Sequence, residues 1–218
     1  MNFKEMFSDL QSRLGDIGQV QYTTAELKQW LNAGQQDVAN RLDNITSRWF
    51  GATAEINTEM NKDEYDLPAD ARRIRAVAYK TEAEGPLAQC MAMDIINRGA
   101  TLNNTFYTPS ATQPFWYQWG NKLGVLPVPT KAVTKGIKVW YFKRLPLLTS
   151  DTDESEIPLE YQNLIILRAH IIAAPKFGQD PTMLANMYNA EFEAIRAIWT
   201  SNLEIELAGQ KKLGGIGA

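Results

Sequence analysis

The chain has 218 residues, of which 44% are hydrophobic and 22% are charged, a composition typical of a globular protein with a buried core. Its 22 basic and 25 acidic residues give a net charge of −3, which argues against a nucleic acid or an anionic membrane surface as a ligand. The single cysteine, Cys90, excludes an internal disulfide and is expected to be a buried apolar residue in a reducing compartment.

The sequence gives no indication of a signal peptide or a membrane span. Its first ten residues contain acids and no apolar core, and the longest apolar run, residues 164–174, is too short to cross a bilayer. We therefore expect the protein in cytoplasm-like surroundings, with no membrane partner.

Two helices are expected before residue 50. Apolar residues recur at helical spacing from Phe3 to Leu14, and Gly15 is a stop signal. The second helix begins at a capping box, in which Thr23 is followed three residues later by Glu26, so that two backbone N–H groups at the helix start are satisfied together. Its apolar stripe consists of Leu27, Trp30, Leu31, Val38, Leu42 and Ile45.

The segment from Gly51 to about Leu148 is typical of β-structure. We expect about six short strands with turn residues between them, including one over residues 72–80 and a last long one over residues 135–146. A short helix over residues 91–99 is expected among them, followed by a loop over residues 101–114.

Helical spacing returns after an acidic connector, residues 150–156, and neither terminal pair of helices can bury its apolar stripe alone. The predicted fold class is therefore α+β, with a helical bundle that carries an inserted antiparallel β-rich segment. The predicted divisions are a bundle of residues 1–50 plus 151–208, a β-rich insertion of residues 51–150 and a flexible C-terminal tail of residues 209–218.

The stretch FWYQWGNKLGVLP, residues 115–127, predicts a hairpin whose two-residue loop is Gly120-Asn121, with Phe115 paired to Leu126. Both faces of this hairpin are apolar, so other elements or a partner must cover the second face. Three interpretations stay open: a place in the core, a platform for sugar rings, or a subunit interface formed by Trp116, Leu123 and Val125.

No pattern in the sequence is typical of a catalytic, cofactor or metal site. The acidic connector lacks the central glycine and distal glutamate of a calcium loop, so we expect a solvated linker. His170 has no recognisable nucleophile or acid to act with, and is expected to be buried and hydrogen-bonded. Phosphate-binding loops are absent. We predict that the protein is not an enzyme and needs no cofactor or metal.

The order of several motifs resembles the head-to-tail adaptor, or connector, proteins of tailed bacteriophages. The resemblance spans roughly residues 3–200 and is carried most clearly by LPADARRI (67–74) and LGVLPVP (123–129). Further matching stretches are YTTAELKQWLNAGQQDVANRL (22–42), IKVWYFKRLPLL (137–148) and IPLEYQNLIILRAHIIAA (157–174).

This resemblance implies a structural virion protein without enzymatic activity. Such adaptors form a ring, usually of twelve copies, that docks under the portal protein and presents a platform for tail or nozzle proteins, with DNA passing through the channel. It implies a place in the neck of the virion, after synthesis in the host cytoplasm. Adaptors commonly anchor on the portal by their C-terminal segment, which here contains Lys211, Lys212, Leu213 and Ile216.

One alternative stays open beside the adaptor. A carbohydrate-binding or tail-associated binding module would stack Trp116, Tyr117 or Trp119 on sugar rings, and would leave these aromatic side chains exposed in a single chain.

Overall fold

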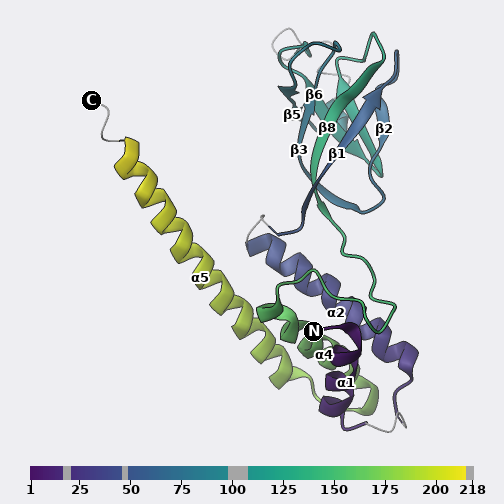
Figure 1. Ribbon diagram of the computed structural model, residues 1–218, viewed down its shortest axis with the longest axis vertical. Coiled ribbons are helices and arrows are strands. Elements are labelled where there is room, and N and C mark those ends of the chain that lie inside the picture. Colours follow the sequence, from purple (N-terminus) through teal and green to yellow (C-terminus); the bar gives the residue numbers. More distant parts are fainter. Residues whose placement is uncertain (17–20, 46–48, 98–107, 215–218) are drawn as a thin grey trace. The chain divides into compact units, whose positions relative to one another are not determined.

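The computed structural model describes residues 1–16, 21–45, 49–97 and 108–214 (Figure 1). The chain forms two compact units, a helical unit of Met1–Phe50 with Leu145–Ala218 and a β unit of Gly51–Arg144. Helices and mostly antiparallel sheets in one chain confirm the predicted α+β class. Leu145 and Leu148, which the predicted division assigned to the β-rich segment, are buried in the core of the helical unit.

The first helix, α1 (Phe3–Leu14), ends as predicted. Gly15 adopts a left-handed conformation with φ of 68°, and its N–H is donated to the carbonyls of the last helical turn. The helix starts at a capping box that the sequence analysis did not identify, in which Asn2 and Glu5 exchange side-chain-to-backbone hydrogen bonds of 2.9 Å. Its buried residues are Phe3, Met6, Leu10 and Leu14.

The second helix, α2 (Thr24–Ile45), confirms the predicted capping box. The Glu26 N–H is donated to Thr23 Oγ1 at 3.3 Å, and the Thr23 N–H to Glu26 Oε2 at 3.0 Å. The same carboxylate accepts a bond of 2.6 Å from Lys176 Nζ, which ties the start of α2 to the segment after α4. The Lys176 bond, followed by the bonds from Thr23, lowers the pKa of Glu26 to about 2.

This depressed pKa predicts how Glu26→Gln acts at different pH. Glutamine keeps the capping geometry but carries no charge. Because ionisation of Glu26 is favoured in the folded state, its stabilising effect is present above the ordinary glutamate pKa of 4.5 and is lost as the pH falls toward about 2. The thermal midpoint of the original chain should exceed that of Glu26→Gln near neutral pH, and the gap should narrow on acidification. In a Lys176→Gln background, Glu26→Gln should change the thermal midpoint only slightly at every pH. If the difference in midpoint is as large as in the original background, Lys176 is not the cause of the lowered pKa of Glu26.

The core of the helical unit is centred on α4 (Gln162–Ala173), which is buried on most sides, as its continuous apolar sequence predicts. It follows a short 3₁₀ turn, η2 (Leu159–Tyr161), and leads into another, η3 (Ala174–Phe177). The last helix, α5 (Thr182–Gly214), covers residues that the sequence analysis divided between the bundle and the tail. Residues before Phe50 and after Leu145 share this core.

The described residues of the β unit form two four-stranded sheets. The first has the order β1 (Gly51–Thr58), β8 (Val133–Lys143), β3 (Ala71–Tyr79), β4 (Ala88–Gln89). The second has the order β2 (Glu64–Asp66), β7 (Lys122–Leu126), β6 (Phe115–Trp119), β5 (Met91–Ala92). Their strands pair antiparallel except β5 with β6. Both sheets contribute to one core, which includes Val77, Leu123, Val125, Ile137 and Val139.

The predicted hairpin forms with the predicted register. Phe115 pairs with Leu126, Tyr117 with Gly124 and Trp119 with Lys122, and Gly120 in the loop has a φ of 56°. The predicted helix over residues 91–99 is wrong. Strand β5 and a single 3₁₀ turn, η1 (Ile95–Asn97), occupy the described part of that segment, because its backbone N–H groups bond to the strands beside it, Met91 to Pro114 and Met93 to Trp116.

Candidate binding surfaces

The residues predicted to form a subunit interface mostly lie inside the β unit. Leu123 and Val125 are fully buried in a single chain, in the core shared by the two sheets. Trp116 is half-buried and packs against the same core. Other elements of the β unit therefore cover this face of the hairpin, and a neighbouring copy does not reach Leu123 or Val125 while the unit is folded. For Trp116, an interface contact stays a prediction.

The opposite face of the hairpin is also covered. Tyr117 is fully buried, its ring lies against Gly124, and its hydroxyl donates to Glu64 Oε1 at 3.0 Å. Trp119, near the tip, is 62% exposed. Of the three aromatic residues considered for stacking on sugars, Trp119 alone is thus exposed, whereas a sugar platform is generally built from several convergent groups.

The candidate reactive residues lie in apolar surroundings. Burial raises the pKa of Cys90 to about 12, so this thiol stays protonated at neutral pH. His170 on α4 is half-buried rather than buried, and partial burial, with a smaller effect of Arg13, lowers its pKa. Within the described residues no group of three His, Cys, Asp or Glu side chains is placed to hold a metal ion.

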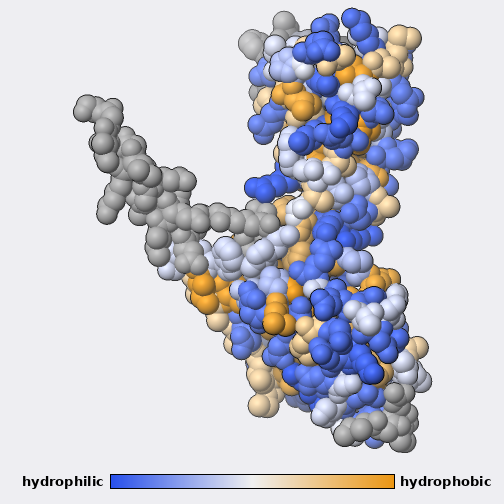
Figure 2. Space-filling model, viewed as in Figure 1, coloured by the Kyte–Doolittle hydropathy of each residue, from blue (hydrophilic) through white to orange (hydrophobic). Residues whose placement is uncertain are grey.

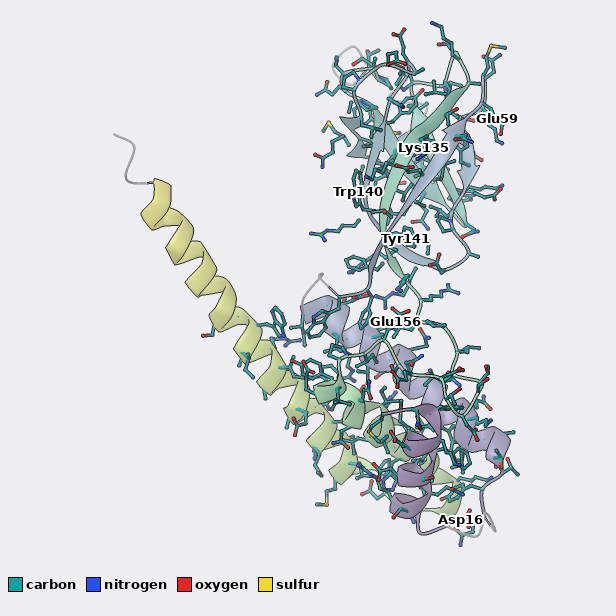
Figure 3. The ribbon with its side chains drawn as sticks, viewed as in Figure 1. Asp16, Glu59, Lys135, Trp140, Tyr141 and Glu156 are labelled. Carbon is teal, nitrogen blue, oxygen red and sulfur yellow. The ribbon has the colours of Figure 1, made fainter. Side chains whose placement is uncertain are left out.

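The acidic connector forms a turn on the helical unit. Asp153 Oδ2 accepts backbone N–H groups of Thr149 and Ser150 at 2.7 and 2.9 Å, which lowers the pKa of this carboxyl group. The Asp153 carbonyl accepts the N–H of Phe3 at 2.8 Å. Beyond it the chain exposes an apolar side chain, Leu159, which is 67% accessible. We term residues 151–160 the acidic segment; its exposed carboxylates are Asp151, Glu154, Glu156 and Glu160 (Glu156 is labelled in Figure 3).

A hollow lies on the first sheet, at residues that no sequence pattern singled out. We term it the Trp140 hollow. It has a volume of about 270 Å³ and is lined by Gly51, Ala52, Thr53, Arg75, Ala76, Trp140 and Tyr141. In the register of the sheet, Trp140 on β8 (labelled in Figure 3) pairs with Thr53 on β1 and Ala76 on β3, so its partners on both sides are small.

One cationic residue, Arg75, lines this hollow, and others lie on the same sheet. Lys138 Nζ lies 5.2 Å from the centre of the Trp140 ring, and the Arg73 guanidinium lies 4.6 Å from the centre of Phe142. Exposed Arg75 sits where the register between β3 and β8 shifts, at a bulge that changes the direction of a side chain. The one carboxylate of β1 on this face, Glu55, lies opposite Lys138 in the strand register and is paired with Lys135 Nζ at 2.8 Å.

Helix α5 has two different faces. Tyr188, Phe192 and Ile195 are buried against the bundle, and the Tyr188 hydroxyl donates to Asp37 Oδ2 on α2 at 2.7 Å. Met183, Met187 and Ile198, large apolar residues of the same helix, are exposed. Figure 2 shows hydrophobic side chains in orange along the described part of this helix.

A comparison with protein families matches residues 1–209 to the family described as SU10 adaptor protein, so the match covers both units of the fold. The chain belongs to the SU10 adaptor protein family. This membership confirms the resemblance to phage head-to-tail adaptors that the sequence motifs indicated. A comparison with curated proteins found no match.

Family membership makes this adaptor a bacteriophage structural protein that associates with other virion components. Of the residues predicted to contact a portal, Lys211, Lys212 and Leu213 fall within α5, and Ile216 lies outside the described residues. No helix in the described ranges is both long and apolar enough to cross a membrane.

Proposed function

We propose that this adaptor forms a ring of twelve copies between the portal and the tail of the virion, with the viral DNA passing through it. The protein has no catalytic role in this proposal: it joins two assemblies. The family match is the observation that carries the proposal, because it extends over both the helical and the β unit and so concerns the whole described fold.

The exposed face of α5 supports a role in assembly. Burial of one large apolar side chain contributes about 1.5–3 kcal/mol, so Met183, Met187 and Ile198 together represent a substantial gain for any partner that covers them. The weak net charge of −3 is consistent with a channel that DNA passes without being retained.

The proposed anchor on the portal is the C-terminal segment with Lys211, Lys212, Leu213 and Ile216, which offers two cations and two apolar side chains within six residues. The first test is the mass of the purified protein with and without the cognate portal protein. A discrete complex with twelve adaptor copies per portal assembly is expected, and a protein that stays free of the portal at every concentration would overturn the proposed function.

Removal of residues 209–218 is expected to abolish binding to the portal without changing the thermal midpoint of the adaptor. These residues follow the last buried contact of α5 that the structure describes, at Ile195 and Trp199. The control replaces the same ten residues by a Gly/Ser stretch of equal length, and should also fail to bind. Portal binding that survives both changes would place the anchor elsewhere on the chain.

A further inference from the structure

We propose that the Trp140 hollow of one copy binds the acidic segment of a neighbouring copy, with Leu159 inserted in the hollow and with Glu154 and Glu160 facing Arg75 and Lys138. This inference rests on the proposed ring and names its subunit contact. A ring requires a heterologous interface, in which two different patches of the same chain meet around an axis. The Trp140 hollow and the acidic segment are two such patches.

The hollow suits a branched apolar side chain. Its lining combines the small residues Gly51, Ala52 and Ala76 with the large side chain of Trp140. At about 270 Å³ it is smaller than a typical small-molecule pocket of about 300–1,000 Å³ but large enough for one aliphatic side chain. Anchor residues at protein interfaces fill desolvated pockets, and aromatic residues such as tryptophan are enriched at these positions.

Leu159 has the properties of the matching anchor. It is 67% exposed, and it opens the short turn η2 directly before Glu160. The segment around it is held in place in the single chain, because Ile157 is buried and the Asp153 carbonyl accepts the N–H of Phe3. A segment that is already ordered loses little conformational entropy when it binds.

The charges of the two units are complementary. Residues 51–144 contain 12 basic and 9 acidic side chains, a net charge of +3, and the rest of the chain contains 10 basic and 16 acidic side chains, a net charge of −6. Contact between the β unit of one copy and the helical unit of the next therefore brings opposite charges together. Such complementarity guides association and disfavours contacts between like units.

The same face is poorly suited to nucleic acid. Stacking of a base needs an open aromatic face, whereas Lys138 already lies over the ring of Trp140. A protein segment that carries both an apolar side chain and carboxylates fits these surroundings better.

The test uses two charge-reversal variants on the full chain, assembled with the cognate portal. The first carries Arg75→Glu and Lys138→Glu, and the second carries Glu154→Lys and Glu160→Lys. Each variant alone brings like charges together at every subunit contact, so each should form the ring at least about tenfold less well than the original chain. An equimolar mixture should recover assembly, because in an alternating ring every contact joins patches of opposite sign: two reversed patches at one contact and two original patches at the next.

Two controls separate this contact from a general effect of charge. Lys131→Glu, at an exposed position of the β unit outside the hollow, should assemble like the original chain. Leu159→Asp should lower assembly without changing the thermal midpoint, since the side chain is exposed. Normal assembly of both reversal variants, or no recovery in their mixture, would overturn the inference.

Other outcomes assign the hollow to another occupant. Recovery only when all four substitutions are in one chain, and not in the mixture, would mean that the hollow binds the acidic segment of its own chain. Loss of DNA binding by the first variant, with assembly unchanged, would assign the face to nucleic acid.

Failure of the proposed function can be distinguished from failure of this inference. If the original chain itself does not form a ring, both are wrong. If the original chain forms a ring and the variants form it equally well, the inference alone is wrong.

Discussion

Gly124→Ala is expected to destabilise the β unit by about 3–5 kcal/mol, because no space exists for a methyl group at this position. A Cβ on residue 124 would lie 2.0–2.4 Å from three carbons of the Tyr117 ring. That ring is fully buried, and its hydroxyl donates to Glu64. Either the ring moves and loses this hydrogen bond to a carboxylate, or strands β6 and β7 separate.

Gly124→Ala should lower the midpoint of thermal unfolding, measured by near-UV circular dichroism, by more than about 12 °C. Gly51→Ala is the matched control, since a Cβ there meets nothing within 4 Å, and should leave the midpoint unchanged. In a Tyr117→Ala background the cost of Gly124→Ala should fall, because the clashing ring is gone. If the Gly124→Ala single variant unfolds at nearly the same midpoint as the original chain, the hairpin accommodates the added methyl group and the prediction is wrong.

Gly34→Ala is expected to destabilise the helical unit by about 3 kcal/mol, although the same substitution stabilises an ordinary helix interior by about 1 kcal/mol. Gly34 lies in the middle of α2 where α4 approaches closely. A Cβ on residue 34 would lie 2.6 Å from the carbonyl oxygen of Ile165 and 3.4 Å from the Ala169 nitrogen. Both atoms belong to the backbone of α4, so the two helices must move apart to relieve the contact.

The control for Gly34→Ala is Asn40→Ala, at an exposed position of the same helix. It should raise the stability slightly, because alanine has the higher helix propensity. Opposite signs for the two substitutions in chemical denaturation would establish that the contact with Ile165 outweighs propensity. A stabilising Gly34→Ala would mean that α2 and α4 pack less closely than in this structure.

The elements that depend on short-range patterns were predictable. The stop at Gly15 and the capping box of Thr23 and Glu26 are signals within four residues, and the hairpin register follows from its two-residue loop. Residues 91–97 were not predictable in this way, since their apolar spacing also fits a helix. Their structure depends on backbone partners at Pro114 and Trp116, which become neighbours only when the β unit folds.

The candidate surfaces were likewise only partly predictable, because they depend on which distant elements pack together. Apolar residues on both faces of the hairpin indicated that something must cover them, but not whether it belongs to the same chain. The first sheet provides that cover, so Leu123 and Val125 are core residues. The alternation of Lys138 and Trp140 with Ile137 and Val139 predicts a strand with two different faces. Which face is left open, and hence the Trp140 hollow, depends on where the second sheet packs.

The shared core of the helical unit has a consequence for synthesis on the ribosome. Residues before Phe50 are packed with residues after Leu145, and the whole β unit lies between them in the sequence. The nascent chain can therefore complete the β unit first, whereas the apolar stripes of α1 and α2 must wait until α4 has been translated. At about 5–20 residues per second, translation of residues 51–173 takes about 6–25 seconds, during which the apolar stripes of α1 and α2 lack the helix that covers them.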